Sequence, residues 1–205
     1  MITFAQFLND AVRNGEAVNT LFEERLFDLV GILHRISDAL TAGQIPHEVI
    51  GGLAVLIHVE EASPEHSALT RDVDLLVRRV DLDRIRQAAA KAGFRFRHAA
   101  GVDMLLYGDL GSVKNAVHLV FSEEKVRPNY LEPTPPITPD RKHIHGKDVM
   151  VIPVADLARM KLTSFRLKDQ VHLKTMDASG LITSEVESGL IPELLARLKY
   201  VRETE

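Results

Sequence analysis

A predicted strand that carries two carboxylates is the feature that most limits how this chain folds. Residues 70–77 read TRDVDLLV, and the apolar, β-prone residues of this run predict a buried strand. Side chains two positions apart on a strand point to the same face, so Asp72 and Asp74 lie side by side. Two like charges this close repel, and burial adds a desolvation cost for each unpaired ion.

A divalent cation would remove both penalties. Mg²⁺ prefers oxygen ligands and is usually held by one or two carboxylates together with substrate phosphates. Asp72 and Asp74 therefore predict half of a metal site that handles phosphate groups. The alternative is that Asp72 lies at the exposed start of the strand and pairs with Arg71 or Arg78.

A glycine pair upstream supplies the other half of such a site. The run EVIGGLAVLI predicts a short strand, the pair Gly51–Gly52, and then a buried helix. Glycines at a strand-to-helix turn let backbone N–H groups approach an anion closely, and the helix N-terminus adds a partial positive charge. We therefore expect a phosphate-binding turn beside the carboxylate strand.

The remaining chain predicts an α+β, or mixed α/β, fold in three parts. They are a helical N-terminal segment (residues 1–44), a core of mixed strands and helices (45–153) and a helical C-terminal segment (154–205). Further helices are predicted at 81–93, 154–176 and 192–203, the first capped by Asp81. Further strands are predicted at 94–99, 102–108, 116–121 and 147–154. Residues 127–142 hold five prolines and predict an extended connector.

Composition excludes several classes of function. The chain has no cysteine, which rules out disulfides and thiolate chemistry. Its net charge of -4 gives no bulk electrostatic reason for tight nonspecific binding to nucleic acid, although a local basic cleft would still allow it. The start of the sequence does not resemble a signal peptide, and no apolar run is long enough to span a bilayer, so we expect a cytoplasmic protein.

Three segments taken in order resemble a known family. VIGGLAVLI, TRDVDLLV and LARMKLTSFRLKDQVHL are similar to the motifs of the DNA polymerase β-like nucleotidyltransferase superfamily. More narrowly, they resemble its AbiEii/AbiGii-type branch, which includes toxins of bacterial toxin–antitoxin systems. The resemblance covers roughly residues 50–173. It implies a nucleotidyltransferase-like mixed sheet flanked by helices.

The resemblance also implies roles for individual residues. Asp72 and Asp74 would bind Mg²⁺, with Mn²⁺ as the alternative. The residues that would bind the nucleotide or its phosphates, or support the helix in the cleft, are Gly51, Gly52, Thr70, Arg71, Lys161, Arg166, Lys168 and Asp169. The alternative for Lys161 is a surface lysine whose stem covers apolar residues.

His118 marks the main departure from the family pattern. The superfamily usually has a third carboxylate on a later strand, and the matching run AVHLVF holds His118 instead. Three interpretations stay open. His118 acts as the general base; or the site uses one metal or another acid, such as Asp103 or Glu123; or the site only binds nucleotide. The interval between Gly52 and Asp72 is also longer than the family's, with the surplus in a polar loop.

The expected function is therefore Mg²⁺-dependent transfer of a nucleoside monophosphate from an NTP to a hydroxyl group. The acceptor would be RNA such as tRNA, a protein or a small molecule, and the protein would be toxin-like with an antitoxin as partner. The alternative is a catalytically reduced protein of the same fold that binds nucleotide or a partner. In the stretch after His118 we expect a solvated loop, or else a wall of the acceptor side formed by Lys125, Arg127 and Tyr130.

Overall fold

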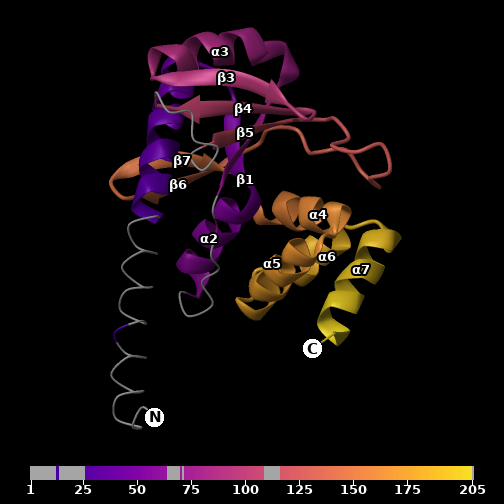
Figure 1. Cartoon of the computed structure of the whole chain (residues 1–205). Helices are drawn as coiled ribbons and strands as arrows, with labels where there is room; N and C mark the ends of the chain where they lie inside the picture. The colour runs from indigo at the N-terminus through magenta and orange to yellow at the C-terminus, as the bar shows by residue number, and fades with distance from the viewer. Residues whose placement is uncertain (1–12, 14–25, 64–69, 71, 109–115, 205) are drawn as a thin grey trace, which may run out of the picture.

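A mixed β-sheet forms the centre of the molecule (Figure 1). The structure is a computed structural model that describes residues 13, 26–63, 70, 72–108 and 116–204. Within these ranges the sheet has seven strands in the order β3-β4-β5-β2-β1-β7-β6. The strands are β1 (His47–Ile50), β2 (Val73–Val77), β3 (Phe94–Ala99), β4 (Val102–Tyr107), β5 (Ala116–Phe121), β6 (Asp140–Ile144) and β7 (Lys147–Val151). The predicted mixed α/β class is confirmed.

The strand that carries Asp74 lies inside the sheet, between β1 and β5. β2 runs antiparallel to β1 and parallel to β5. Its apolar residues Val73, Leu75, Leu76 and Val77 are buried, which explains why the sequence places β-branched and aliphatic residues around the carboxylate. A central strand is held on both sides by backbone hydrogen bonds, so its polar side chains are positioned accurately.

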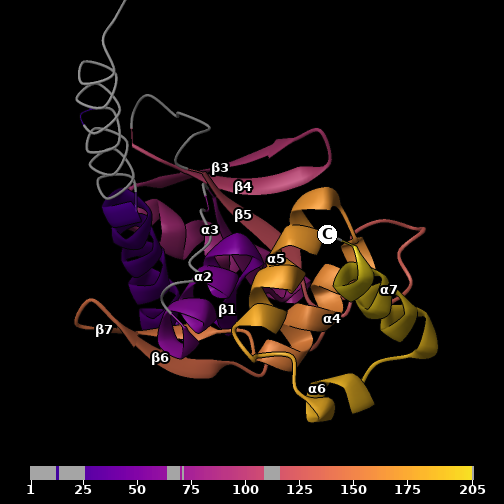
Figure 2. The ribbon, with the colours of Figure 1, turned by 90° about the horizontal axis from the view of Figure 1, so that it is seen from below.

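Helices cover the sheet and form a separate group at the C-terminal end. Residues 26–42 are helical, and the earlier part of the predicted N-terminal helix lies outside the described residues. The other helices are α2 (Gly51–Ala62), α3 (Leu82–Lys91), α4 (Val154–Ser164), α5 (Leu167–Ala178), α6 (Ser184–Ser188) and α7 (Pro192–Glu203). Figures 1 and 2 both place α2 between the N-terminal helix and α5, with α4 to α7 gathered together. None of the helices in the described ranges is long and apolar enough to cross a lipid bilayer.

The prediction of one long helix over residues 154–176 is wrong. The helix α4 ends at Ser164, because the next residue, Phe165, takes a left-handed backbone conformation (φ 48°). The carboxylate of Asp169 then accepts a hydrogen bond from the backbone N–H of Arg166 (3.2 Å), which caps the start of α5. Two helices therefore replace one, and residues before and after Phe165 lie on different elements.

Two smaller expectations also need correction. Asp81 precedes α3 as predicted, but its carboxylate accepts hydrogen bonds from Arg78 (2.7 Å) and Arg84 (2.6 Å) and makes no cap bond to the helix backbone. The β6 strand lies where the proline-rich connector was predicted to continue, and it forms an antiparallel hairpin with β7. Its sequence, DRKHI, is mostly polar and part-exposed, so it lacks the apolar alternation that reveals a strand.

One continuous hydrophobic core joins the parts of the chain. Its buried residues run from Leu29 in the N-terminal helix through the sheet to Val201 in α7. The division into segments 1–44, 45–153 and 154–205 stays a prediction, and this core crosses both of its boundaries.

Candidate functional site

The glycine pair and the carboxylate strand meet directly. Ile50, the last residue of β1, is paired in register with Asp74 of β2. Gly51 follows with φ +75°, and a Cβ atom at this position would lie 2.1 Å from Oδ2 of Asp74. Such a contact is far below van der Waals distance, so only glycine fits here. The antiparallel pairing of β1 with β2 therefore places the glycine turn against the carboxylate.

The same turn opens α2 toward an anion. Gly51 and Gly52 are the first residues of α2, and the N-cap residue Ile50 has no side-chain group that could accept from the N–H groups of the first turn. A Cβ at Gly52 would lie 2.6 Å from Oγ1 of Thr70 and 3.4 Å from Cε1 of His172. The turn is thus a narrow cradle at a helix N-terminus whose N–H groups receive no hydrogen bond from the N-cap side chain, as suits a phosphate site.

His118 lies beside Asp74 on the next strand. The two residues are register partners in the parallel pair of β2 and β5, and Nδ1 of His118 donates to Oδ1 of Asp74 over 3.1 Å. This hydrogen bond raises the pKa of His118 above its usual value, against the opposing effect of burial. Because a carboxylate only accepts, Nδ1 carries the hydrogen and Nε2 is the atom left to bind a proton.

The carboxylates suit a hard divalent cation. Both Asp72 and Asp74 line the cavity, and the Asp74 side chain keeps 27% of its surface exposed, so its oxygens are within reach of a ligand. In the part of the chain that the structure describes, no three His, Asp or Glu side chains come together as a metal-binding group. Asp72 and Asp74 would therefore hold Mg²⁺ or Mn²⁺ as two carboxylate ligands, with phosphate or water oxygens as the others.

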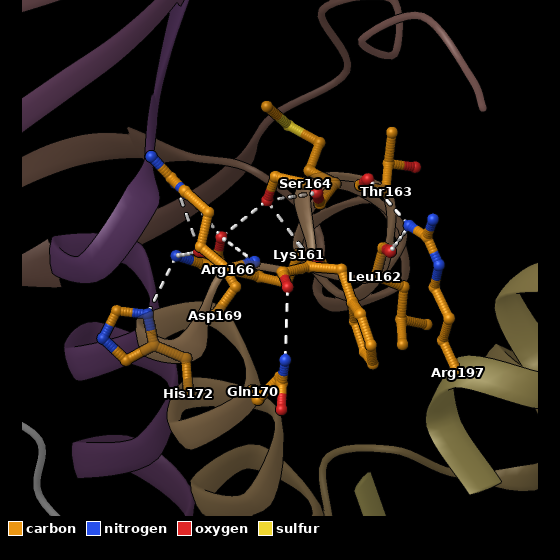
Figure 3. Close-up of polar contacts among 11 residues, drawn as sticks. Lys161, Leu162, Thr163, Ser164, Arg166, Asp169, Gln170, His172 and Arg197 are labelled. Atoms are coloured by element: carbon orange, nitrogen blue, oxygen red, sulfur yellow. Dashed lines mark hydrogen bonds and ion pairs between the residues drawn. The ribbon is translucent and has the colours of Figure 1, made fainter. Parts of the chain in front are cut away.

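Lys161 is buried, with only 4% of its surface exposed, and this contradicts the alternative of a surface lysine. Its ammonium group donates to Oδ1 of Asp169 (3.0 Å) and to Nδ1 of His172 (2.9 Å), as Figure 3 shows. Burial lowers the pKa of Lys161, and the negative charge of Asp169 opposes that shift. The helix break at Phe165 makes this geometry, because it brings α5 residues back toward α4.

Asp169 is the anchor of this network. Its fully buried carboxylate accepts from Lys161, from Nε of Arg166 (2.7 Å) and from the hydroxyl of Ser164 (2.7 Å). Burial favours the neutral acid, but the hydrogen bond from Arg166 and the charge of Lys161 outweigh it and hold the pKa of Asp169 well below its usual range. Asp169 therefore stays ionised and keeps Lys161 and Arg166 at the edge of the cleft.

His172, to which the sequence motifs gave no role, lies between Gly52 and Lys161, the two halves of the site. Burial, with the nearby charge of Lys161, lowers the pKa of His172 to about 4, so its ring is neutral at physiological pH. Its Nδ1 accepts from Lys161 and its Cε1 edge lies against Gly52. His172 thus joins the cradle to the lysine. It lies within the third motif of the sequence, but the motif alone assigned it no role, because this relation depends on the helix break.

One cavity of about 510 Å³ collects most of the predicted residues. Its lining includes Gly51, Asp72, Asp74, His118, Lys161, Arg166, Lys168 and Asp169. Gly52 and Thr70 form the wall of the cradle behind it. Arg71 lies outside the described residues.

Of the other acids and loop residues that the sequence predicts for the site, some line the cavity and others lie on the surface. Asp103 lines the cavity but is in register with Leu119, one position along from His118, and its carboxylate contacts Nδ1 of His98 at 2.5 Å. Lys125 and Tyr130 also line the cavity. Glu123 and Arg127 are exposed and do not line it.

Several solved structures share the architecture of this chain. No protein-family model matches the sequence, and no curated protein matches it. The antibiotic-resistance factor ANT(2'')-Ia superposes with a TM-score of 0.56 at 14% identity, over 83% of this chain and 91% of that chain. The lincosamide antibiotic adenylyltransferase LnuA gives 0.50 at 10% identity, over 73% and 96% of the two chains.

A larger enzyme shares the same arrangement. The polyadenylate synthase of Megavirus superposes with a TM-score of 0.52 at 9% identity, over 89% of this chain and 39% of the viral chain. Identities this low establish the architecture alone. The chain therefore has a nucleotidyltransferase-like fold.

Proposed function

We propose that this protein is a nucleotidyltransferase that moves a nucleoside monophosphate from an NTP to a hydroxyl group of an acceptor. The observation that carries the proposal is the register of β1, β2 and β5, which places the Gly51 turn, Asp74 and His118 side by side. A phosphate cradle, a carboxylate pair and a proton acceptor are the parts that such a transfer needs. When bound at Asp72 and Asp74, Mg²⁺ would neutralise phosphate charge.

The residues of the site would act mainly by positioning. The acceptor oxygen attacks the α-phosphorus and forms a new P–O bond, while the bond from the α-phosphorus to the bridging oxygen breaks and pyrophosphate leaves. Nε2 of His118 takes the proton of the attacking hydroxyl. The Gly51–Gly52 turn binds the triphosphate, and Lys161 with Arg166 offsets its charge. Thr70 and Lys168 would complete the nucleotide site.

Two finer points rest on likeness rather than on geometry. ANT(2'')-Ia has been crystallised with adenylyl-2''-tobramycin, LnuA with lincomycin, and the Megavirus protein is a polyadenylate synthase. These neighbours support nucleotidyl transfer and leave the acceptor class open. A toxin-like role with an antitoxin partner, and membership of the AbiEii/AbiGii-type branch, rest only on the three sequence motifs.

Calorimetric titration with each of the four NTPs, with and without Mg²⁺, tests the proposal. Wild type should bind at least one NTP only when Mg²⁺ is present, and the variant Asp72→Asn/Asp74→Asn should lose that binding while keeping its circular dichroism spectrum. Asp83→Asn, an exposed acid on α3, is the matched control and should bind as wild type does. Folded wild type that binds no Mg–NTP would contradict the proposal.

Replacement of the usual third acid by His118 favours the alternative of a protein that binds nucleotide without transferring it. Pyrophosphate release in the presence of acceptors separates the two. A transferase should release pyrophosphate in an acceptor-dependent way, and His118→Gln should slow that release by about a hundredfold, the size of a typical general-base contribution. Tight Mg–NTP binding that is never followed by release would establish the alternative.

A further inference from the structure

The cavity continues beyond the carboxylates into a region that nucleotide binding does not use. Residues 122–139 connect β5 to β6, and both this connector and α4 contribute side chains to the part of the lining that lies beyond β5. The residues that line this end include Phe121, Glu124, Tyr130, Glu132 and Thr163. Of these residues, only Tyr130 is predicted from the sequence to lie at the acceptor side.

Two polar atoms at this end are buried and unpaired. Thr163 has only 7% of its surface exposed, and neither its Oγ1 nor Oε2 of Glu132 has a hydrogen-bond partner within the described part of the chain. In Figure 3 the backbone carbonyl of Thr163 accepts from Arg197, while no dashed contact joins its hydroxyl to the other residues drawn. A buried polar group left unpaired costs about 1–3 kcal/mol, so native proteins rarely keep one without reason.

Thr134, on the same connector, differs from Thr163 because its buried hydroxyl has partners within the protein. Its buried hydroxyl donates to the carbonyl of Phe121 (2.5 Å) and accepts from the N–H of Glu124 (3.2 Å), so both of its roles are filled within the protein. The connector is therefore able to satisfy a buried hydroxyl. Thr163 and Glu132 both line the cavity and each keeps a polar atom without a partner among the described residues, which points to a ligand as the missing partner.

The geometry of the transfer assigns this end of the cavity to the acceptor. The strand order β5-β2-β1 places the phosphate cradle on one side of Asp74 and His118 on the other. Attacking and leaving oxygens lie roughly in line across the transferred phosphorus. With pyrophosphate held at the cradle, the acceptor approaches from the side of β5, and β5 leads directly into the connector.

The charged side chains at this end of the cavity indicate which class of acceptor would bind there. Arg79 is already used by the protein, because it forms two 2.6 Å hydrogen bonds to Glu124 and lies 3.7 Å from the centroid of the Phe121 ring. Lys125 is exposed to water. None of the ion pairs among the described residues involves Glu132, so its carboxylate is left to attract a cationic donor and to repel a phosphodiester.

We propose that the acceptor is a small aminated polyol, such as an aminosugar, whose ammonium group donates to Glu132 and whose hydroxyl group bonds to Thr163. This inference rests on the proposed nucleotidyl transfer and names its acceptor class. A cavity of about 510 Å³ has the size of a small-molecule site, for which roughly 300–1,000 Å³ is usual.

A transfer assay tests the acceptor class. The protein is incubated with Mg²⁺, NTPs labelled at the α-phosphate, and glucosamine or its β-1,4-linked disaccharide. The N-acetylated counterparts, which lack the ammonium group, and bulk tRNA are run in parallel. Label should pass to the amino compounds at least about tenfold faster than to the acetylated ones, as expected for loss of one charge-assisted hydrogen bond.

Matched variants connect the result to the two residues. Glu132→Gln and Thr163→Val keep the size of each side chain and should each lower kcat/KM for the amino acceptor about tenfold, with an unchanged dissociation constant for Mg–NTP. Glu193→Gln, at an exposed position on α7, should leave both values unchanged. Thermal unfolding of each variant checks that it is folded.

The outcomes separate this inference from the proposed function. Equal transfer to amino and acetylated sugars, preferential transfer to tRNA, or insensitivity to Glu132→Gln would each overturn the acceptor class while leaving nucleotidyl transfer intact. Mg–NTP binding with no transfer to any amino compound would overturn it as well. Absence of Mg–NTP binding would contradict the proposed function itself.

Discussion

Glu48 shows how one buried side chain makes stability depend on pH. This residue of β1 is fully buried, and Oε2 accepts a hydrogen bond from the backbone N–H of Thr138 in the connector (3.2 Å). Its Oε1 has no partner in the described part of the chain. Burial raises the pKa of Glu48 to about 7, and the nearby acids Asp156 and Asp140 act in the same direction.

Glu48→Gln should therefore stabilise the protein in a pH-dependent way. Between about pH 4.5 and pH 7 the folded state keeps a proton on Glu48 that the unfolded state has lost, so the stability of wild type falls as pH rises. The glutamine variant does not titrate, and its advantage should grow from near zero at pH 4.5 to about 3 kcal/mol at pH 8. Urea unfolding at the two pH values measures the difference.

Glu193→Gln provides the control, because Glu193 is exposed and its substitution should change stability equally little at both pH values. A Glu48→Gln advantage that is the same at pH 4.5 and pH 8 would show that Glu48 is not titrating in this range.

At the level of elements, the break between α4 and α5 organises the cationic side of the site. Asp169 balances the charges of Lys161 and Arg166 and also caps α5. The ion pair of Lys161 and Asp169 is almost fully buried, with 6% and 0% of the two side chains exposed. Removing one partner of such a pair leaves the other charge without compensation in a dry environment.

Asp169→Asn should accordingly lower the free energy of unfolding by about 3 kcal/mol, the lower end of what breaking a buried pair costs. Asp177→Asn on the same helix is the control, because Asp177 pairs with Arg202 at the surface and should lose no more than about 1 kcal/mol. Urea unfolding at neutral pH compares the two variants. Equal losses would mean that Asp169 does not anchor the α4–α5 junction.

The elements differ in how well the sequence could predict them. The strands around Asp74 and His118 were predictable because β-branched and aliphatic runs are bounded by turn residues. The helix break was not, since the run TSFRLKD has neither Gly nor Pro and reads as continuous helix. The left-handed conformation of Phe165 is maintained by tertiary contacts, including the edge-to-face contact of its ring with Tyr200. β6 is polar and owes its existence to pairing with β7.

On the scale of the whole molecule, the C-terminal helices support one wall of the cavity. Arg197 of α7 donates to the carbonyls of Leu162 (2.7 Å) and Thr163 (2.9 Å) at the end of α4. Its guanidinium group also lies 5.0 Å from the centroid of the Phe165 ring. One side chain thus fastens α7 to the helix that carries both Lys161 and Thr163.

Arg197→Met should remove these bonds while keeping most of the side-chain volume. The expected loss of stability is about 2 kcal/mol, because two buried carbonyls lose their donor and the ring loses its cation. Lys199→Met, two positions along the same helix and exposed, should change stability by less than about 0.5 kcal/mol. Thermal and urea unfolding measure both, and a similar result for the two variants would show that α7 is held by apolar packing alone.

The residues of the candidate site could be predicted only where neighbouring residues in the sequence indicate their role. The sequence indicates the Gly51–Gly52 turn and the carboxylates Asp72 and Asp74. Each of them lies where the neighbouring residues predict an apolar strand or helix. Glu132 carries no such signal, and Thr163 and His172 lie within the third motif without any local feature that gives them a role. Their relation to the cavity exists only after α5 folds back on α4 and the connector runs from β5 to β6.

The pairing of Ile50 with Asp74 has an evolutionary consequence. Backbone hydrogen bonds between β1 and β2 set the separation of the glycine turn and the carboxylates, so the segment that joins Gly52 to Asp72 along the chain does not. The number of residues between the end of α2 at Ala62 and Thr70 is therefore free to change without displacing the reactive groups, whereas α2 itself is held by its buried residues. A lineage carrying this architecture would be able to explore new recognition surfaces beside an unaltered centre.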